Sequence, residues 1–259
     1  MIDTHCHLDD PAYADDLAQI IQRAQEAGIT RILVPGTEVE SINSVRRICD
    51  QLGGYALPAV GLHPENINER YREELDTIHE AISGYDKWVA VGEIGLDYHF
   101  DTTFVRQQRD AFEAQLAWAR EAGLPVMIHS RDATQDMENI LADAAKQGSR
   151  GVVHCFSGSY ETACKYLDSG WVLGIGGVLT FKNSKLSDVL RRLPVESLVL
   201  ETDGPYLAPT PHRGERNESA YIPLVAVRLA EIYGTTVQEI ERITDKTATD
   251  LFGISAFCG

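Results

Sequence analysis

A short stretch near the start of the chain, "DTHCH" at positions 3–7, combines residue types that bind transition metals. In a β-strand, successive side chains point to opposite faces, so Asp3, His5 and His7 would share one face. Imidazole nitrogens and carboxylate oxygens are common ligands of divalent transition metals. A lone His-x-His pair is weak support for a metal site, because two solvent-facing histidines can have the same spacing. The pair predicts half of a metal site if other segments supply the rest.

Other polar residues capable of binding metal stand at the ends of apolar runs further along the chain. They are His63, Glu93, His129, His154, Glu201 and Asp203. Each could have an ordinary structural role, such as a buried neutral histidine or a carboxylate that accepts a backbone hydrogen bond. Buried polar groups cost free energy unless they are partnered, so this many in equivalent places are poorly explained as independent accidents. A fold that brings these run ends together is required.

Eight apolar runs predict the strands of such a fold. They cover residues 1–6, 31–36, 55–64, 87–97, 124–130, 150–156, 171–178 and 197–203. Amphipathic stretches such as residues 15–28, 41–54, 104–123 and 159–170 lie between them and end in glycine. Near-continuous Val, Ile and Leu in strands that alternate with helices predicts a buried parallel sheet.

A closed (β/α)₈ barrel, or TIM barrel, fits the count of eight, and the candidate ligands then lie at its carboxyl ends, where such enzymes build active sites. A doubly wound sheet is disfavoured because "GIGG" at residues 174–177 lacks the next glycine of a dinucleotide fingerprint. An extra C-terminal helix from about Val237 to Leu251 is expected to complete the outer ring. We predict an α/β chain with a single domain over residues 1–259.

The number of candidate ligands predicts two metal ions. Four histidines and two acids exceed what one tetrahedral ion needs, and paired ions suit the hydrolysis of phosphate esters or amides. Glu93 has two oxygens and stands near the middle of the strand order, so we expect it to bridge the ions. Asp203 is expected to bind metal and to take the proton of the attacking water as general base.

Eight motifs along the chain resemble those of the TatD family of metal-dependent deoxyribonucleases, within the wider amidohydrolase-type barrels. They are "DTHCHLD", "GLHPE", "GEIGLDY", "PVMIHSRDA", "VVHCFSGS", "GIGGVLTF", "LETDGPYLAP" and "PHRGERN". The resemblance covers residues 1–253 and implies metal ligation by His5, His7, Glu93, His129, His154 and Asp203. In many amidohydrolases a carboxylated lysine occupies the place of Glu93, so the glutamate favours the TatD branch. The resemblance also implies hydrolysis of DNA from the 3′ end.

Residues around the predicted ligands are candidates for substrate binding and for orienting the ligands. His63 is expected beside the scissile phosphate, and Arg131 and Arg213 are expected to bind phosphate through their planar guanidinium groups. Arg216 belongs to the same glycine-containing loop as Arg213, and His212 could donate to phosphate or shape that loop. Two acids, Asp97 and Glu201, are expected to orient histidine ligands. His79 and His99 are expected to lie outside the site.

Composition limits the compartment and the mode of substrate binding. The formal net charge of −16 argues against a broad electrostatic grip on nucleic acid, although bound cations can attract phosphate locally. The five cysteines, which include Cys258, lack a Cys-x-x-Cys spacing, so we expect a reducing cytoplasm. No signal peptide or membrane span is expected, and no obligate protein partner is evident.

Three functions remain in competition at this point. The first is a two-metal phosphodiesterase that uses DNA, single-stranded or bound at an end, as substrate. The second is a metal-dependent amidohydrolase or deacylase acting on a small molecule or an aminoacyl ester, because the same ions can activate water against a carbonyl. The third is a metal-binding interaction protein without turnover. The ions could be Zn, Mn, Fe or Ni, which histidine and carboxylate suit well, or Mg, which they suit poorly.

Overall fold

The structure is a computed structural model that describes residues 1–99 and 101–254, so Cys258 lies outside the described residues. Within these residues, eight parallel strands pair in the order of the sequence. They are β1 (Ile2–Asp3), β2 (Arg31–Val34), β3 (Ala56–Val60), β4 (Ala90–Asp97), β5 (Val126–Arg131), β6 (Gly151–Val153), β7 (Val172–Ile175) and β8 (Leu198–Leu200). Each strand lies in, or overlaps, one of the predicted apolar runs.

The sheet closes because β8 meets the segment that follows β1. Thr4 N donates to Leu200 O at 3.0 Å, and Asp203 N donates to His5 O at 2.9 Å. A parallel bridge between Cys6 and Gly204 continues this seam beyond the strands. The predicted (β/α)₈ barrel is therefore confirmed.

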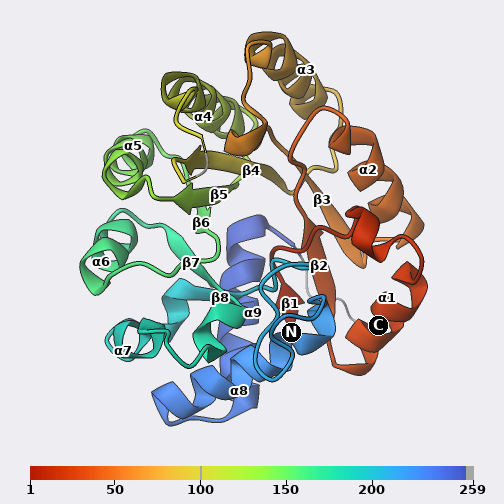
Figure 1. The fold of residues 1–259 in the computed structure, drawn as a ribbon, viewed down its shortest axis with the longest axis vertical. Helices are drawn as coiled ribbons and strands as arrows, with labels where there is room; N and C mark the ends of the chain where they lie inside the picture. Colours follow the sequence, from red (N-terminus) through yellow and green to blue (C-terminus); the bar gives the residue numbers. More distant parts are fainter. Residues whose placement is uncertain (100, 255–259) are drawn as a thin grey trace.

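Helices follow the strands and form the outer layer of the barrel (Figure 1). They are α1 (Leu17–Glu26), α2 (Ser41–Gln51), α3 (Tyr71–Ser83), α4 (Val105–Glu121), α5 (Thr134–Lys146), α6 (Tyr160–Asp168), α7 (Leu186–Leu190) and α8 (Ile222–Tyr233). Gly123 after α4 has a φ of 72° and Gly170 after α6 a φ of 83°. Both follow the helix end in the left-handed conformation that glycine adopts without strain.

The extra C-terminal helix, α9 (Val237–Phe252), is present but does not complete the outer ring as expected. Its Ala248, Leu251 and Phe252 pack with residues of several strands, such as Leu33 and Met127, in a cluster separate from the main core. Figure 1 shows α9 behind the strands. These side chains fill the inside of the barrel at its amino-terminal end and would otherwise meet water, so α9 covers that end.

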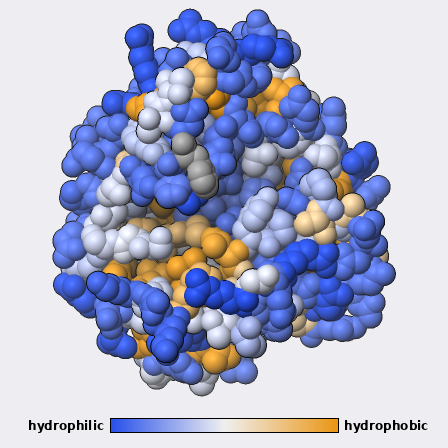
Figure 2. Space-filling model, in the orientation of Figure 1, coloured by the Kyte–Doolittle hydropathy of each residue, from blue (hydrophilic) through white to orange (hydrophobic). Residues whose placement is uncertain are grey.

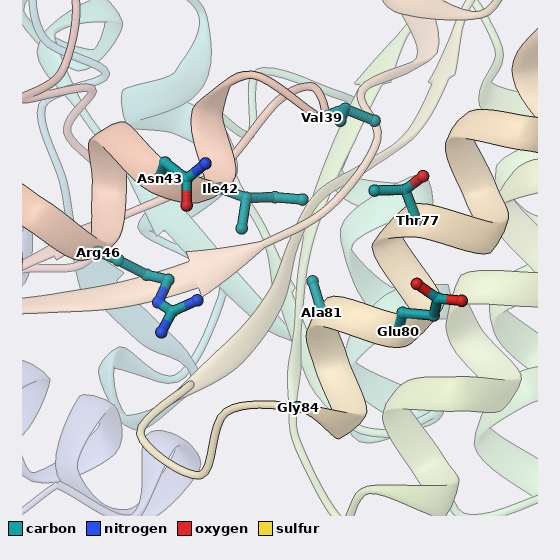
Figure 3. Close-up of a pocket in the computed structure, with 8 residues that line it drawn as sticks. All are labelled: Val39, Ile42, Asn43, Arg46, Thr77, Glu80, Ala81 and Gly84. Carbon is teal, nitrogen blue, oxygen red and sulfur yellow. The ribbon is translucent and has the colours of Figure 1, made fainter.

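The outer surface carries a hollow of about 360 Å³ between α2 and α3 (Figure 3). Its lining includes Val39 and Ile42 on one side and Thr77 and Glu80 on the other, with Arg46 stacked on the ring of Tyr85 at 4.2 Å. This lining contains none of the predicted ligands. The predicted metal ligands lie elsewhere, in the strands and just beyond their carboxyl ends.

Two further observations bear on the compartment expected from the sequence. Among the described residues, no helix is both long enough and apolar enough to cross a membrane. The described cysteines, Cys6, Cys49, Cys155 and Cys164, are all free thiols.

Candidate metal centre

The strands and the segments just beyond them bring all six predicted ligands to one place. His129 lies within β5, His154 follows β6 directly, and Asp203 lies beyond β8. Glu93 does not end its strand as expected but lies in the middle of β4, where the pairing with β5 shifts register between Val91 and Ile94. A β-bulge re-aims a side chain, and here the bulge coincides with the residue that the ligands surround.

Glu93 presents its two carboxylate oxygens to two different sets of histidines. Its Oε2 lies 3.1 Å from His5 Nε2 and 3.5 Å from His7 Nε2. Its Oε1 lies 2.7 Å from His154 Nε2 and 3.0 Å from His129 Nδ1. The carboxylate thus stands between a pair of histidines from the start of the chain and a pair from β5 and β6, as a bridging ligand must.

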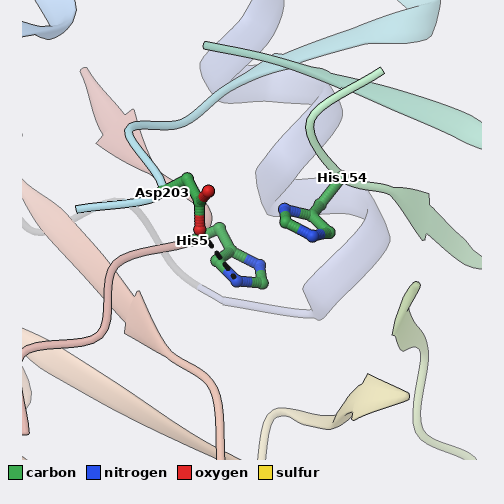
Figure 4. Close-up of side chains that lie close together, drawn as sticks. All are labelled: His5, His154 and Asp203. Carbon is green, nitrogen blue, oxygen red and sulfur yellow. Dashed lines mark ion pairs between the residues drawn. The ribbon is translucent and has the colours of Figure 1, made fainter. Parts of the chain in front are cut away.

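Asp203 faces the same pair as Glu93 Oε2. Its Oδ1 lies 3.6 Å from His7 Nε2 and 3.9 Å from His5 Nε2, and Figure 4 shows the carboxylate pointing to His5 with the His154 ring alongside. The His5 and His154 rings stack with centroids 4.0 Å apart. Side chains from the segments that follow β1, β6 and β8 therefore meet at a single point.

The donor atoms fit a divalent transition metal. Bonds of 2.0–2.2 Å in a tetrahedral site put neighbouring ligand atoms about 3.4 Å apart. The His5 and His7 Nε2 atoms are 3.3 Å apart. The distances from these two nitrogens to Glu93 Oε2 and Asp203 Oδ1 range from 3.1 to 3.9 Å. The described residues also form further triads of possible ligands around Glu93, one with His5 and His7 and one with His63 and His129. Nitrogen and carboxylate donors in this spacing can bind metal.

The electrostatics of the cluster favour ionised carboxylates. Burial acts to raise the pKa of Glu93, but the positive charges of His154, His5 and His63 hold it well below its usual range. Burial likewise opposes ionisation of Asp203, whose pKa is nevertheless lowered by the hydrogen bond to His7 and the charges of His154 and His5. Both acids are therefore anionic and able to bind a cation.

Comparison with known proteins identifies the family of this barrel. The family model for the TatD related DNases matches residues 2–253. The chain belongs to the TatD family. This membership confirms the resemblance inferred from the motifs and makes the chain a metal-dependent hydrolase.

Similar TatD-family proteins cover the chain from end to end. An uncharacterized metal-dependent hydrolase, YabD of Bacillus subtilis, is 38% identical over 98% of this chain and 100% of its own. The 3′-5′ ssDNA/RNA exonuclease TatD of Pantoea ananatis is 32% identical over 98% of this chain and 100% of its own. The crystal structure of YjjV, a TatD homologue from Escherichia coli K12, superposes with a TM-score of 0.91 and 33% identity, covering 98% of both chains.

A second carboxylate supports His129 in this TatD-family site. Asp97 Oδ2 lies 2.8 Å from His129 Nε2, on the opposite side of the ring from Glu93. Burial acts to raise the pKa of Asp97, but hydrogen bonds from His129 and from the backbone of His99 lower it to about 2. The sequence predicted that Asp97 orients a histidine, and the geometry places it where it can do so.

Glu201 and His154 form a less complete pair. Glu201 Oε1 accepts a hydrogen bond from Cys155 N and lies 3.9 Å from His154 Nδ1. His154 Nδ1 and Glu201 Oε2 are both buried without a hydrogen-bond partner. A Cβ on Gly174 would overlap the Glu201 carboxylate, so only glycine leaves room for it. Two buried polar groups that face each other across a short gap suit the predicted role of Glu201 in orienting His154.

Asp3 departs from the expectation that it shares a face with His5 and His7. Its carboxylate turns to the β8 side, where it accepts from Thr202 Oγ1 at 2.7 Å, Ser219 Oγ at 2.6 Å and Thr202 N at 3.0 Å. The strand β1 ends at Asp3, so alternation does not continue to the histidines. Asp3 ties the seam of the barrel instead of entering the metal cluster.

Sequence reasoning missed Asn217 altogether. This fully buried side chain donates through Nδ2 to Thr202 O and to Tyr206 O, both at 2.7 Å. These carbonyls flank Asp203, whose φ of 58° is uncommon for a residue other than glycine. Asn217 therefore holds the turn that presents Asp203. The only signal was its place at the end of the "PHRGERN" motif.

The histidine predicted to bind substrate lies within the cluster. His63 Nε2 is 3.4 Å from Glu93 Oε1, and its ring meets that of His129 with centroids 4.4 Å apart. His63 is thus close enough to act as a metal ligand as well as to contact a substrate phosphate. Its predicted role beside the phosphate stays a prediction.

The predicted phosphate-binding arginines divide into two kinds. Arg213 lies in the loop after β8 with its guanidinium 4.4 Å above the ring of Phe181, and Arg131 ends β5 at the exposed rim. Arg216 is instead committed to Asp16, which it contacts at 2.8 and 2.6 Å. Arg216, in the same loop as Arg213, therefore has its charge paired with a carboxylate.

The remaining histidines lie outside the cluster. His212 bonds Glu215 at 2.9 Å and stacks on Tyr221, which favours a role in loop structure. His79 stacks on Trp118 in the outer layer. His99 Nδ1 lies 2.7 Å from Asp132 Oδ2, near Asp97 but apart from the ligands.

Proposed function

We propose that this protein hydrolyses phosphodiester bonds in DNA with two divalent metal ions and removes nucleotides from the 3′ end of single strands. The observation that carries the proposal is the division of Glu93, whose two oxygens face two separate sets of histidines. Paired divalent ions are suited to in-line displacement at phosphorus because they stabilise both the attacking and the leaving oxygen.

The two ions would be held by different parts of the cluster. His5, His7 and Asp203 would hold one ion, His129 and His154 the other, and Glu93 would contribute an oxygen to each. When bound, such ions supply Lewis acidity and make water a stronger nucleophile at neutral pH. Zn, Mn, Fe and Ni suit these donors better than Mg does.

The protein's own groups would then position the substrate and move the proton. Asp203 accepts the proton of the attacking water, and Glu93 holds the two halves of the site in register. His63 donates to the scissile phosphate, and Arg131 and Arg213 grip phosphates that do not react. Asp97 and Glu201 fix the rings of His129 and His154, so that each presents one nitrogen to the site.

Two observations favour a nucleic acid over other phosphate esters. A relative that is 32% identical along its whole length is named as a 3′-5′ exonuclease of single-stranded DNA and RNA. The rim of the site also carries Arg131 and Arg213 in a chain whose overall net charge is −16. Both support a nucleic acid, DNA included, as the substrate class.

The test is to incubate protein reconstituted with each metal with single-stranded DNA labelled at its 5′ end. A ladder of progressively shorter labelled products is expected from digestion at the 3′ end, whereas immediate release of a labelled mononucleotide would indicate the opposite polarity. A parallel panel of amides and aminoacyl esters tests the alternative. Turnover of that panel without cleavage of DNA would replace the proposal with an amidohydrolase or deacylase.

A further inference from the structure

Large apolar side chains reach the surface at the mouth of the site. Among the described residues, those exposed to this degree are Tyr206 (54%), Leu207 (40%) and Val227 (45%). Tyr206 and Leu207 are consecutive and follow Asp203 by only a few residues. Figure 2 shows apolar surface beside the central hollow, on the side where Figure 1 places β7 and β8. Two of these three side chains therefore border the candidate active site.

The loop holds these side chains outward. Tyr206 donates its hydroxyl to Asp10 Oδ2 at 2.9 Å, and its ring lies edge-on to His7 with centroids 6.2 Å apart. Leu207 has a φ of 53°, an uncommon conformation for a leucine. A Cβ on Gly177 would overlap the Leu207 carbonyl, so the loops after β7 and β8 are in close contact. The hydrogen bond to Asp10, the backbone conformation of Leu207 and the contact with Gly177 therefore fix this loop with both side chains exposed.

A second aromatic side chain continues the row away from the cluster. Phe181 belongs to the loop after β7, and the Arg213 guanidinium covers its ring at 4.4 Å. Thr210 N donates to Thr180 Oγ1 at 2.8 Å, which fixes the two loops beside these residues. An aromatic ring capped by arginine offers a flat, positively charged surface, and such surfaces stack with nucleobases.

Positive charge follows the same side of the molecule. Residues 181–192 contain Lys182, Lys185, Arg191 and Arg192 against the single acid Asp188, a net charge of 4 − 1 = +3. The whole chain carries −16, so this segment differs in sign from the chain as a whole. Lys182 and Lys185 are exposed between Phe181 and α7, where they can meet a phosphate backbone.

We propose that the loops after β7 and β8 form a stacking track for the unpaired bases of the substrate strand. The inference rests on the proposed function and adds to it the side chains that hold the bases of the strand. One base stacks on Tyr206 and Leu207 beside the cluster, a base further along stacks on Phe181 and Arg213, and the phosphates pass Lys182 and Lys185. Stacking tolerates any base, whereas a duplex hides its bases in pairs.

Equilibrium binding tests the track separately from catalysis. The probes are two fluorescent single strands with phosphorothioate linkages that resist cleavage, one an oligothymidylate and one a matched strand of abasic residues. Wild-type protein should bind the oligothymidylate about tenfold more tightly per stacked base. The Tyr206→Ala and Leu207→Ala variants should lose most of this preference and leave binding of the abasic strand unchanged.

Matched variants separate stacking from damage to the loop. Tyr206→Phe keeps the ring and should bind like the wild type, and Val227→Ala removes an exposed apolar side chain from α8 with no effect. Equal binding of both strands by the wild type, or no binding of either, overturns the track. If Tyr206→Ala loses the preference for the oligothymidylate over the abasic strand, the track is supported even if the protein does not cleave DNA. If the protein cleaves DNA but binds both strands equally, the proposed function stands and the track is wrong.

Discussion

At the scale of single residues, the site depends on carboxylates whose two oxygens do different work. Glu93 divides its oxygens between two sets of histidines, and Asp97 turns His129 so that one ring nitrogen faces Glu93. Asp203 is both a candidate ligand and the candidate general base. Its two roles are separable by a change that keeps the shape of the side chain and removes its charge.

We expect Asp203→Asn to lower turnover of DNA by at least about 10² even when its metal content is restored. The amide can still coordinate an ion weakly but cannot accept a proton near neutral pH, and five other ligands remain. Metal content and turnover should be measured on one preparation at saturating metal, with the exposed Asp143→Asn on α5 as control. Recovery of near wild-type turnover would show that Asp203 is a ligand only.

Metal binding at neutral pH should release protons. Burial acts to lower the pKa of His129 and of His154, but Asp97 and Glu93 raise the first to about 9, and Glu93 raises the second to about 10. Both rings are therefore protonated at pH 7 without metal, and each must lose one proton to coordinate. Affinity should consequently rise as the pH is raised toward those values.

Titration calorimetry at pH 7 in two buffers of different ionisation enthalpy measures this release. We expect about two protons to leave when the His129 and His154 side of the site is filled. Identical binding enthalpies in both buffers at pH 7 would contradict the charge state described here.

At the scale of elements, the turn after β8 presents Asp203 only because distant residues hold it. Asn217 binds the carbonyls on both sides of it, and Asp3 binds Thr202 through its backbone and side chain. The strands and most helices were predictable because buried strands are apolar and helices end in glycine. These braces were not, because hydrogen bonds between residues 11 to 199 positions apart leave no local pattern.

Asn217→Ala should lower the free energy of unfolding by about 2 kcal/mol, because it leaves the buried Thr202 carbonyl without its partner. Metal content should also fall, since Asp203 loses the brace on both sides. Urea unfolding and elemental analysis measure the two effects, with the exposed Asn139→Ala on α5 as the matched control. Loss of stability with full metal content would show that Asn217 supports the fold but does not position Asp203.

At the scale of the whole molecule, the barrel was predictable and the placement of its last helix was not. Eight apolar runs implied eight strands, and the carboxyl ends of parallel strands converge. The candidate ligands could therefore be grouped from the sequence alone. That α9 covers the bottom of the barrel instead of joining the ring depends on how its apolar side fits the strand interiors. The single domain, the cytoplasmic location and the absence of an obligate partner stay predictions.

The charge of the molecule predicts a shallow salt dependence of DNA binding. The chain has 39 acids against 23 lysines and arginines, and the proposals above bring only four of these cations, Arg131, Lys182, Lys185 and Arg213, to the substrate strand. For a single strand, the slope of log K against log salt should be no steeper than about −3. Fluorescence anisotropy over a series of salt concentrations measures it, and a slope near −7 would reveal a larger cationic surface.

The seam between the segment after β1 and β8 also determines when the site can form during synthesis. His5 and His7 precede the other candidate ligands in the chain, yet the segment that carries them is held by Leu200 and Thr202, and Ile2 N donates to Asp245 on α9. The two histidines therefore acquire these fixed neighbours only after the segments that contain Leu200 and Asp245 have been synthesised. Contacts of such long sequence separation form late and slowly. Because Asp203 follows the other five candidate ligands in the chain, the full ligand set can bind an ion only after this late segment has been synthesised and has paired with the residues after β1.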